Sequence, residues 1–271
     1  MQITTLEGVP TDVIAEIFNQ AFSDYLVPIQ LTEEMLLEKM RAENTMPDHS
    51  AGVFQGGNLV GFILIGIDNG IAYNGGTGVI PDCRGQNLTR RMYDFLIPLL
   101  DQKGIRKHLL EVLTENQRAV PVYRKIGFET VRTVSCFKGK IGNSLQSAVV
   151  IREIELDEIL PECCDFAPTY QNTIAAIVRG GTNKVVGAFD AGSLAGFIVF
   201  APETARIKHF GVVKTHRLCG IGKQLFQEVQ SIAGEKMLSL INVDDRDGSI
   251  VFLEKIGFEK TVSQFEMRLE I

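Results

Sequence analysis

The sequence predicts two α+β domains in tandem, each with a mixed, mostly antiparallel sheet flanked by helices. A strand, a glycine-containing loop and an amphipathic helix occur twice, and the loop arginines Arg84 and Arg217 lie 133 positions apart. Residues 125–128 and 255–258 both read Lys-Ile-Gly-Phe, at an offset of 130. Offsets that drift by a few residues in an unchanged order indicate a duplication, and 271 residues fit two domains of ordinary size.

The first half begins with a predicted strand over residues 1–8. Thr11 and Asp12 precede apolar residues at helical spacing, so we expect them to cap an amphipathic helix. A second helix starts at Thr32-Glu33-Glu34, because acids are favoured in a first turn. The remaining elements are a hairpin over residues 51–67 with its turn at Gly56-Gly57, a strand over 71–80, the helix after the loop, a strand over 108–113, a short helix ending at 126 and a strand over 129–138 that closes the unit.

The second half repeats this order. Residues 139–143 contain glycine and lysine and form the predicted linker, which gives domains over residues 1–140 and 147–271. A strand over residues 148–156, one helix within 160–180 and a hairpin over 185–197 that matches 51–62 at an offset of 135 follow the linker. We therefore expect the same fold twice, with a shorter helical segment in the second copy.

Composition narrows the class of protein. The hydrophobic fraction of 45% and the charged fraction of 22% are typical of globular domains. A net charge of −6 argues against nucleic acid as the main ligand, because phosphate contacts need a basic surface. The 5 cysteines lack metal-site spacing, and no apolar run is long enough to span a membrane. No signal-peptide pattern is present, so we expect a soluble cytoplasmic protein without a bound metal, a nucleic-acid partner or a membrane partner.

The repeated loop is the main functional signal. A strand, a glycine turn and a helix N-terminus together form a common binding site for a pyrophosphate. The glycines let backbone N–H groups approach the ligand, and the helix N-terminus adds partial positive charge. Both halves carry this arrangement, which strengthens a motif that is weak when it occurs once.

Two motifs in the first half resemble a known family. The chain reads Val-x-Pro-x-x-Arg-Gly-x-x-Leu-Thr from Val79, and later Asn116-x-x-Ala-x-x-x-Tyr123-x-x-x-Gly-Phe. Together with the intervening helix and strand, this pattern resembles the acetyl-coenzyme-A-dependent N-acetyltransferase superfamily (GNAT), in both halves. The family's pyrophosphate motif, Arg/Gln-x-x-Gly-x-Gly/Ala, is intact in the second half as Arg217, Gly220 and Gly222, and is altered in the first half to Arg84, Asn87 and Thr89.

The resemblance implies acetyl-CoA as the cofactor and a particular way of binding it. The fourth strand diverges from the fifth, and backbone groups at the end of the fourth strand pair with the pantetheine arm. The loop amides hold the pyrophosphate. The implied cofactor-binding residues are Gly78, Val79, Arg84, Gly85, Gln86, Asn87, Leu88, Thr89 and Asn116 in the first half, and Gly211, Val212, Arg217, Leu218, Cys219, Gly220, Ile221 and Gly222 in the second. Asn116 is also suited to cap a helix.

The implied reaction transfers an acetyl group from the thioester to a primary amine. It needs a base for the amine and a proton donor for the leaving thiolate. Tyr123 falls where the family commonly has that donor, and Glu111 on the preceding strand is a candidate base. His209 is a weaker candidate, since a lone histidine there is more typical of a sheet residue. Asp24 could attract an amine or belong to a helix end.

The halves depart from the pattern in opposite ways. Leu253 stands where the first half has Tyr123, and Arg246 stands where it has Asn116, so we expect catalysis in the first domain. The alternatives are catalysis in the second domain, a non-catalytic acyl-CoA-binding sensor or scaffold, and a tandem relative that uses aminoacyl-tRNA, against which the acidic composition counts. We expect the acceptor to be a small-molecule or peptide amine and the chain to be a monomer or a homodimer.

Overall fold

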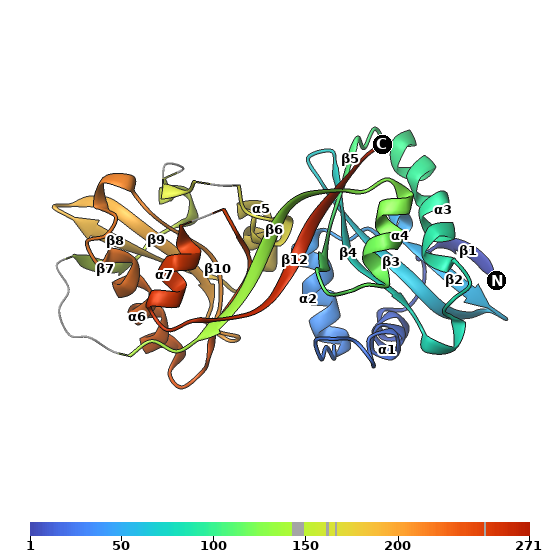
Figure 1. Ribbon diagram of the computed structural model, residues 1–271, viewed down its shortest axis with the longest axis horizontal. Coiled ribbons are helices and arrows are strands. Elements are labelled where there is room, and N and C mark those ends of the chain that lie inside the picture. Colours follow the sequence, from blue (N-terminus) through green and yellow to red (C-terminus); the bar gives the residue numbers. More distant parts are fainter. Residues whose placement is uncertain (143–148, 161–162, 166, 247) are drawn as a thin grey trace. The chain divides into compact units, whose positions relative to one another are not determined.

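The computed structural model describes residues 1–142, 149–160, 163–165, 167–246 and 248–271. Contacts divide the chain into two compact units, unit 1 with Met1–Val131 and Phe265–Ile271, and unit 2 with Arg132–Gln264. The elements, labelled in Figure 1, are β1 (Gln2–Thr5), α1 (Thr11–Ala21), α2 (Glu33–Glu43), β2 (Ala51–Gln55), β3 (Asn58–Asp68), β4 (Ile71–Val79), α3 (Leu88–Gln102), β5 (Lys107–Leu113), α4 (Ala119–Ile126), β6 (Glu129–Gly139), β7 (Val150–Glu153), α5 (Ile174–Gly180), β8 (Lys184–Asp190), β9 (Ser193–Ala201), β10 (Arg206–Val212), α6 (Ile221–Ala233), β11 (Leu238–Asp244), α7 (Ser249–Lys255) and β12 (Glu259–Glu270).

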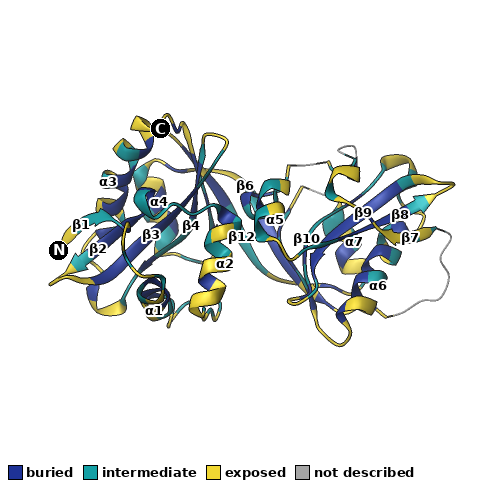
Figure 2. Ribbon diagram, turned by 180° about the vertical axis from the view of Figure 1, so that it is seen from behind, coloured by how far each residue is buried: buried dark blue, intermediate teal, exposed yellow. Residues whose placement is uncertain are grey.

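Unit 1 is a mixed sheet between two helical layers. Its strands lie in the order β1-β2-β3-β4-β5, antiparallel from β1 to β4 and parallel between β4 and β5. Apolar side chains of α3 and α4 form one core with the sheet, and those of α1 and α2 form another. Strand β3 contributes to both cores and is buried along most of its length, as Figure 2 shows.

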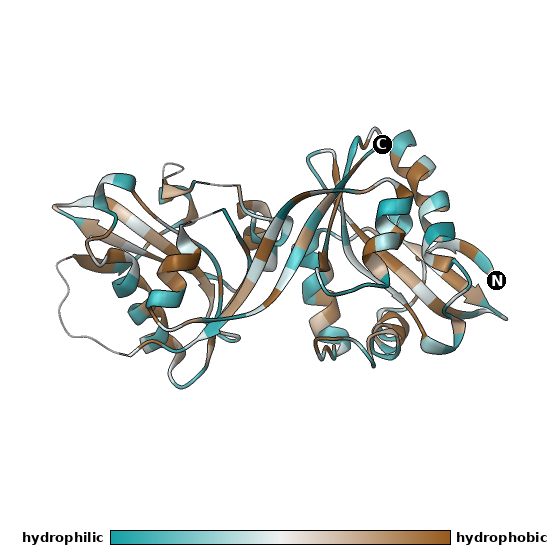
Figure 3. Cartoon of the chain, in the orientation of Figure 1, coloured by the Kyte–Doolittle hydropathy of each residue, from teal (hydrophilic) through white to brown (hydrophobic). Residues whose placement is uncertain are grey.

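Unit 2 repeats this plan. Its strands lie in the order β7-β8-β9-β10-β11-β6, with β10 and β11 parallel and the other neighbours antiparallel. The helices α6 and α7 supply one core, and the segment around α5 supplies the other. Strand β9 is buried like β3, and Figure 3 shows both strands with mainly apolar colouring. The predicted fold class is therefore confirmed in both halves.

Most of the predicted elements are present. The hairpin turns at Gly56-Gly57, both with positive φ, and its strands pair up to Gln55↔Asn58. The second helix begins after Thr32, whose side chain accepts a hydrogen bond from the N–H of Met35. The first helix is present, but Thr11 and Asp12, which were expected to cap it, are its first two residues. Its N-cap is Pro10, and no side chain caps it. The predicted linker ends at Asn143, which lies outside the described residues.

The closing strands differ from the prediction. Strand β6 was expected to close the first domain, but it pairs with β11 of unit 2, from Leu238↔Gly139 to Asp244↔Val134. The end of β12 belongs to unit 1, where the N–H of Ile271 donates to the carbonyl of Arg106 beside β5. Each unit is thus completed by the last strand of the other half, and its boundaries differ from the predicted 1–140 and 147–271.

The exchange is physically permitted because the two last strands are copies of each other. Met267 lies 130 positions after Phe137, the same offset as the Lys-Ile-Gly-Phe repeat. Met267 is buried in the core of unit 1 and Phe137 in the core of unit 2. Either strand presents an equivalent apolar face to either sheet, so exchange preserves the core contacts.

Among the described residues, no helix is both long enough and apolar enough to cross a bilayer.

Candidate active site

In both units, two parallel strands diverge at the same place. Strands β4 and β5 pair from Ile71↔Lys107 to Asn74↔Leu110, after which β4 continues to Val79. Strands β10 and β11 pair at residues 206–207, after which β10 continues to Val212. Each longer strand carries a register shift against its antiparallel neighbour just beyond the paired stretch. This divergence, which the family resemblance implied, opens each sheet at the end that leads into the glycine loop.

The two glycine loops share one backbone conformation. Gly85 and Asn87 have φ of +77° and +59°, and the matching Leu218 and Gly220 have φ of +64° and +87°. Each loop therefore uses one glycine and one non-glycine residue at its two left-handed positions. Successive N–H groups in such a conformation line a concavity that suits an anion, and α3 and α6 begin directly after it. The loop of unit 1 has this conformation although its motif is altered.

The loop arginines have partners within the protein. Arg84 donates through Nε to the carbonyl of Val79 (3.0 Å) and through both terminal nitrogens to the carboxylate of Asp24 (2.7 and 2.8 Å). Arg217 donates through Nε to the carbonyl of Val212 (2.9 Å) and through Nη1 to Asp165 (2.6 Å). The hydrogen bond from each arginine lowers the pKa of its aspartate partner. Each arginine therefore fastens a neighbouring loop to the strand end. The positive charge of Arg84 also faces Asp24, which argues against Asp24 as the group that attracts an amine.

A cavity of about 730 Å³, here called the first cavity, lies at the divergence in unit 1. The predicted residues among its lining are Gly78, Val79, Arg84, Gly85, Asn87, Leu88, Thr89, Asn116 and Tyr123. Gln86 and Glu111 lie outside this lining. Asn116 Oδ1 also accepts a hydrogen bond from the N–H of Ala119 (3.0 Å), the first residue of α4, although the N-cap of that helix is Arg118.

A polar network lies beside Tyr123 at the divergence. Asn74 Nδ2 donates to Thr77 Oγ1 and to Tyr93 Oη, both at 2.7 Å, and Asn74 Oδ1 accepts from the N–H of Gly76 at 2.9 Å. Burial raises the pKa of Tyr123, while hydrogen bonds with Thr77 and Asn74 lower it. The phenol is therefore protonated at neutral pH. Asn74, Thr77 and Tyr93 were not among the predicted site residues. The signal that could have found them is that the residues 133 positions later are all apolar.

Glu111 lies on the other face of the sheet. Its Oε2 accepts a hydrogen bond from Tyr73 Oη at 2.6 Å, and Tyr73 and Asn74 are consecutive, so their side chains point to opposite faces. Burial raises the pKa of Glu111 to about 7, with smaller contributions from Glu266 and Glu43, while Tyr73 opposes the shift. A carboxyl with this pKa can exchange a proton near neutral pH.

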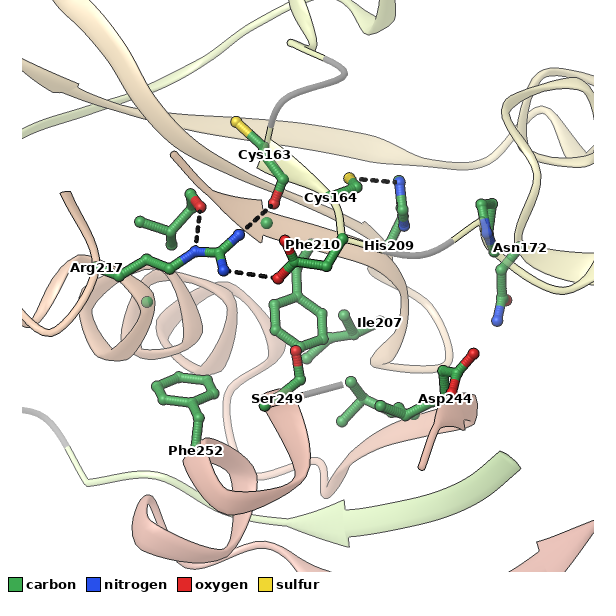
Figure 4. A pocket seen from close by; sticks show the side chains of 18 of the residues that line it. Cys163, Cys164, Asn172, Ile207, His209, Phe210, Arg217, Asp244, Ser249 and Phe252 are labelled. Atoms are coloured by element: carbon green, nitrogen blue, oxygen red, sulfur yellow. Dashed lines mark hydrogen bonds and ion pairs between the residues drawn. The ribbon is translucent and has the colours of Figure 1, made fainter. Parts of the chain in front are cut away.

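A second cavity, of about 660 Å³, lies at the divergence in unit 2 (Figure 4). The predicted residues among its lining are Gly211, Val212, Arg217, Leu218, Gly220 and Gly222, whereas Cys219 and Ile221 lie outside it. Its wall is apolar where unit 1 has the network, with Ile207, Phe210 and Phe252 among the lining residues. Leu253, at the position of Tyr123, is fully buried in the core.

Polar groups lie at the end of β11 in the second cavity. Asp244 accepts hydrogen bonds from Arg246 and from Arg132. Burial raises the pKa of Asp244, but the bonds from the two arginines outweigh it and hold the value at about 2. Arg246, at the position of Asn116, is therefore held by a carboxylate. No cluster of His, Cys, Asp and Glu that could hold a metal ion occurs in the part of the chain that the structure describes.

Comparisons with known proteins agree on both halves. Residues 12–128 match the model of the Acetyltransferase (GNAT) family, and residues 163–268 match that of the Acetyltransferase (GNAT) domain. A search of curated proteins finds no match.

Solved structures resemble nearly the whole chain. A tandem GNAT protein from the clavulanic acid biosynthesis pathway is 14% identical with a TM-score of 0.70, and the match covers 99% of this chain and 98% of that one. A GCN5-related N-acetyltransferase from Sphaerobacter thermophilus is 14% identical with a TM-score of 0.77, covering 99% and 95%. A putative acetyltransferase from Pyrococcus horikoshii is 14% identical with a TM-score of 0.67, covering 100% and 88%. At this identity, the likeness supports the fold.

Proposed function

Because the chain belongs to the GNAT acetyltransferase family, with one domain of that family in each half, we propose that it transfers an acetyl group from acetyl-CoA to a primary amine. The first domain carries the chemistry, and the second binds the same donor. Acetyl-CoA, when bound, supplies the acetyl group as a reactive thioester. The acceptor is a small-molecule or peptide amine.

The glycine loops fit a pyrophosphate. A Cβ built at Gly85 or Gly220 meets no atom within 4 Å, so the space beside each of these loop glycines is open. The amides of residues 84–89 and 217–222 donate to the phosphate oxygens in this proposal, and each such charge-assisted bond contributes about 1.5–3 kcal/mol. The backbone of Gly78-Val79, and of Gly211-Val212, supports the pantetheine arm beyond the divergence.

Glu111 acts as the base in this proposal. An amine is cationic near neutral pH and must lose a proton before it can attack a carbonyl. The pKa of Glu111, raised to about 7 by burial, gives a carboxylate basic enough to take that proton, directly or through water.

Tyr123 acts as the acid. Its phenol lies in the first cavity and is protonated, so it can donate a proton to the thiolate that leaves. Thr77 and Asn74 hold the hydroxyl in place. The base and the acid lie on opposite faces of the sheet, so in this proposal they reach the amine and the leaving thiolate from the two sides of the divergence.

The single observation that carries the assignment is the contrast between the two units at matched positions. Unit 1 has a hydrogen-bonded polar set there, made of Asn74, Thr77, Tyr93 and Tyr123. Unit 2 has Ile207, Phe210, Phe226 and Leu253, none of which can transfer a proton. Both units keep the loop, and only the first keeps this acid.

A titration with acetyl-CoA tests the proposal. Thr89 lies in the first turn of α3 and Lys223 in the first turn of α6, and each lines its cavity. A glutamate in a first turn is favourable for the helix but repels a phosphate. We expect two sites by calorimetry, with Thr89→Glu removing one and Lys223→Glu the other, while the uncharged controls Thr89→Gln and Lys223→Gln keep both.

Turnover then locates the chemistry. Release of CoA thiol is followed with a panel of amines, such as spermidine, glucosamine and an alanyl peptide. We expect Tyr123→Phe and Thr89→Glu to lower the rate by about 10²-fold or more. Tyr170→Phe, a buried tyrosine of the other unit, is the matched control. The absence of any acetyl-CoA binding would contradict the proposed function, and two-site binding without turnover on any amine favours the sensor alternative.

A further inference from the structure

A cysteine and a histidine face each other in the second cavity. Cys164 Sγ and His209 Nε2 are 3.3 Å apart, within hydrogen-bonding distance for sulfur, and both residues line the cavity (Figure 4). The imidazole also packs edge-on against Phe197, with ring centroids 5.2 Å apart. With its proton on Nδ1, the neutral imidazole can accept the thiol proton at Nε2.

The backbone on both sides of Cys164 is held in place. Arg217 donates to the carbonyl of Cys163 (3.5 Å) and to the carboxylate of Asp165 (2.6 Å), as Figure 4 shows for the labelled residues. Gly211 allows this approach, because a Cβ there would lie 2.6 Å from the carbonyl oxygen of Cys163. The thiol is therefore fixed beside the strand that leads to the pyrophosphate loop.

The pair has no counterpart in the first unit. In unit 2, His209 of β10 pairs with Val199 of β9. The matching pair in unit 1 is Gly76 and Leu64, so a glycine stands where unit 2 has His209. Asp24 and Asp165 both bind the loop arginine, so the residue that matches Cys164 is Ser23. Ser23 donates to the carbonyl of Gln20 at a helix end instead. The dyad is thus a feature of the second unit alone.

We propose that Cys164 is a nucleophile that accepts an acyl group from an acyl thioester bound in the second cavity. His209 Nε2 takes the proton of the Cys164 thiol, and the thiolate attacks the thioester carbonyl. A new carbon–sulfur bond forms to Cys164, the bond to the donor's sulfur breaks, and His209 returns the proton to the leaving thiolate. One thioester and one thiol give one thioester and one thiol, so atoms and electrons balance.

This chemistry suits a site without a tyrosine acid. In the first unit the proposed donor to the leaving thiolate is Tyr123, and Leu253 in its place cannot donate. The imidazolium of His209, formed in the first step, performs the same task at the same divergence. A nucleophile paired with a base in this way is a general arrangement for covalent catalysis.

The inference rests on the proposed binding of acyl-CoA by the second domain, and it adds a covalent acyl-enzyme to it. Exchange between two thioesters is close to neutral in free energy, because equivalent bonds form and break. An excess of donor therefore leaves most of Cys164 acylated, unless a bound acceptor removes the group.

Mass spectrometry of the full-length protein tests this directly. We expect incubation with excess acetyl-CoA to add an acetyl group to the peptide that contains Cys164, in a form that hydroxylamine removes. Cys164→Ser abolishes this label, and His209→Asn slows its formation by about 10²-fold or more. Exposed Cys219 on the same chain serves as the internal reference for non-specific acylation.

A second measurement needs no thioester. Iodoacetamide reacts with thiolates, so at pH 7 we expect Cys164 to be alkylated faster than Cys219. We also expect Cys164 to be alkylated at least about tenfold more slowly in His209→Asn and His209→Gln than in the parent protein. Unchanged melting temperatures show that these variants remain folded. Equal alkylation rates with and without His209 overturn the proposal.

The outcomes separate this inference from the proposed function. Binding of acetyl-CoA in the second cavity without acylation of Cys164 overturns the acyl-enzyme and leaves the acetyltransferase intact. A small acetyl thioester of cysteamine carries no phosphate, so it should still acylate Cys164 in the Lys223→Glu variant. Labelling of Cys164 by acetyl-CoA should fall in the same variant. If acetyl-CoA binds nowhere, the proposed function fails, and labelling by the cysteamine thioester still decides whether the dyad is reactive.

Discussion

Two buried ionisable residues of unit 1 have pKa values moved in opposite directions by the same cause. Burial raises the pKa of Glu111 to about 7 and lowers that of His108 to about 3. Both shifts favour the neutral form, since a low-dielectric interior penalises charge. Glu111 lies beside the strand divergence, where the proposed reaction needs a proton acceptor for the amine. His108 packs against Tyr93 and Phe128 in the core, with ring centroids 5.5 and 5.3 Å away.

Glu111→Gln should separate activity from stability. The folded-state pKa of Glu111 exceeds the unfolded value of 4.5, so Glu111 stays protonated to a higher pH in the folded state. The free energy of unfolding therefore falls as pH rises from about 4.5 to about 7. The amide avoids this loss and can still accept the bond from Tyr73. We expect Glu111→Gln to gain up to about 3 kcal/mol relative to the parent protein between pH 5 and pH 8 while losing turnover. Urea unfolding at both pH values measures the gain, and a constant difference contradicts it.

His108→Phe should change the acid dependence of stability. The folded-state pKa lies below the unfolded value of 6.5, so stability is fully present above about pH 6.5 and is lost as pH falls towards 3. Removing the imidazole should reduce the loss between pH 8 and pH 5 by about 2 kcal/mol. Because the comparison is between two pH values, a constant packing penalty from the larger ring cancels. Identical pH profiles for both proteins would show that His108 does not contribute.

At the scale of the elements, the two glycine loops adopt the same backbone conformation with different residues. Both need left-handed backbone at two positions, which costs least with glycine or asparagine. Unit 1 uses Gly85 and Asn87, and unit 2 uses Leu218 and Gly220. Leu218 is the costly choice, because it combines φ of +64° with a fully exposed apolar side chain.

Leu218→Gly should therefore stabilise unit 2. A left-handed conformation costs an ordinary residue roughly 1–2 kcal/mol, part of which is offset by the greater freedom of glycine in the unfolded chain. We expect a net gain of about 0.5–1 kcal/mol by chemical unfolding. Leu218→Ala is the matched control, since it removes the same exposed side chain and keeps the strained φ. A gain of equal size in both variants would assign the effect to hydrophobic exposure instead.

The whole molecule is organised by the exchange of the last strand of each half, β6 and β12. Strand β6 follows the first half in sequence but completes unit 2, and the end of β12 completes unit 1. Pairing at the matching register also repeats between the copies, since Gly61↔Val79 and Phe62↔Gly78 in unit 1 match Gly196↔Val212 and Phe197↔Gly211 in unit 2. The units are copies of one fold. Unit 1 is made of two separate segments, whereas unit 2 is the single segment Arg132–Gln264.

Substitutions in the exchanged strands should act on the half to which they do not belong in sequence. Met267→Ala leaves a cavity in the core of unit 1 and should destabilise that unit by about 2–5 kcal/mol. Phe137→Ala should destabilise unit 2 by about 3–5 kcal/mol. Hydrogen exchange read by mass spectrometry should show faster exchange in residues 1–131 for Met267→Ala and in 132–264 for Phe137→Ala. The reverse pattern would contradict the exchange of strands.

The sequence by itself determined the local features of this protein. The duplication, the helices and the hairpins follow from residue spacing and backbone preferences, and the place of Tyr123 follows from the family resemblance. Even the conformation of the altered loop was accessible, because asparagine tolerates the left-handed region that Asn87 occupies.

Only the tertiary structure decided which distant groups meet. Partners such as Asp24 for Arg84, Tyr73 for Glu111 and His209 for Cys164 are separated by 60, 38 and 45 positions, and nothing local specifies them. The same holds for β6 and β12, because the apolar face of a strand does not specify which strand it pairs with. Two copies of one strand fit two copies of one sheet equally well. Chain connectivity and the packing of the complete molecule made that choice.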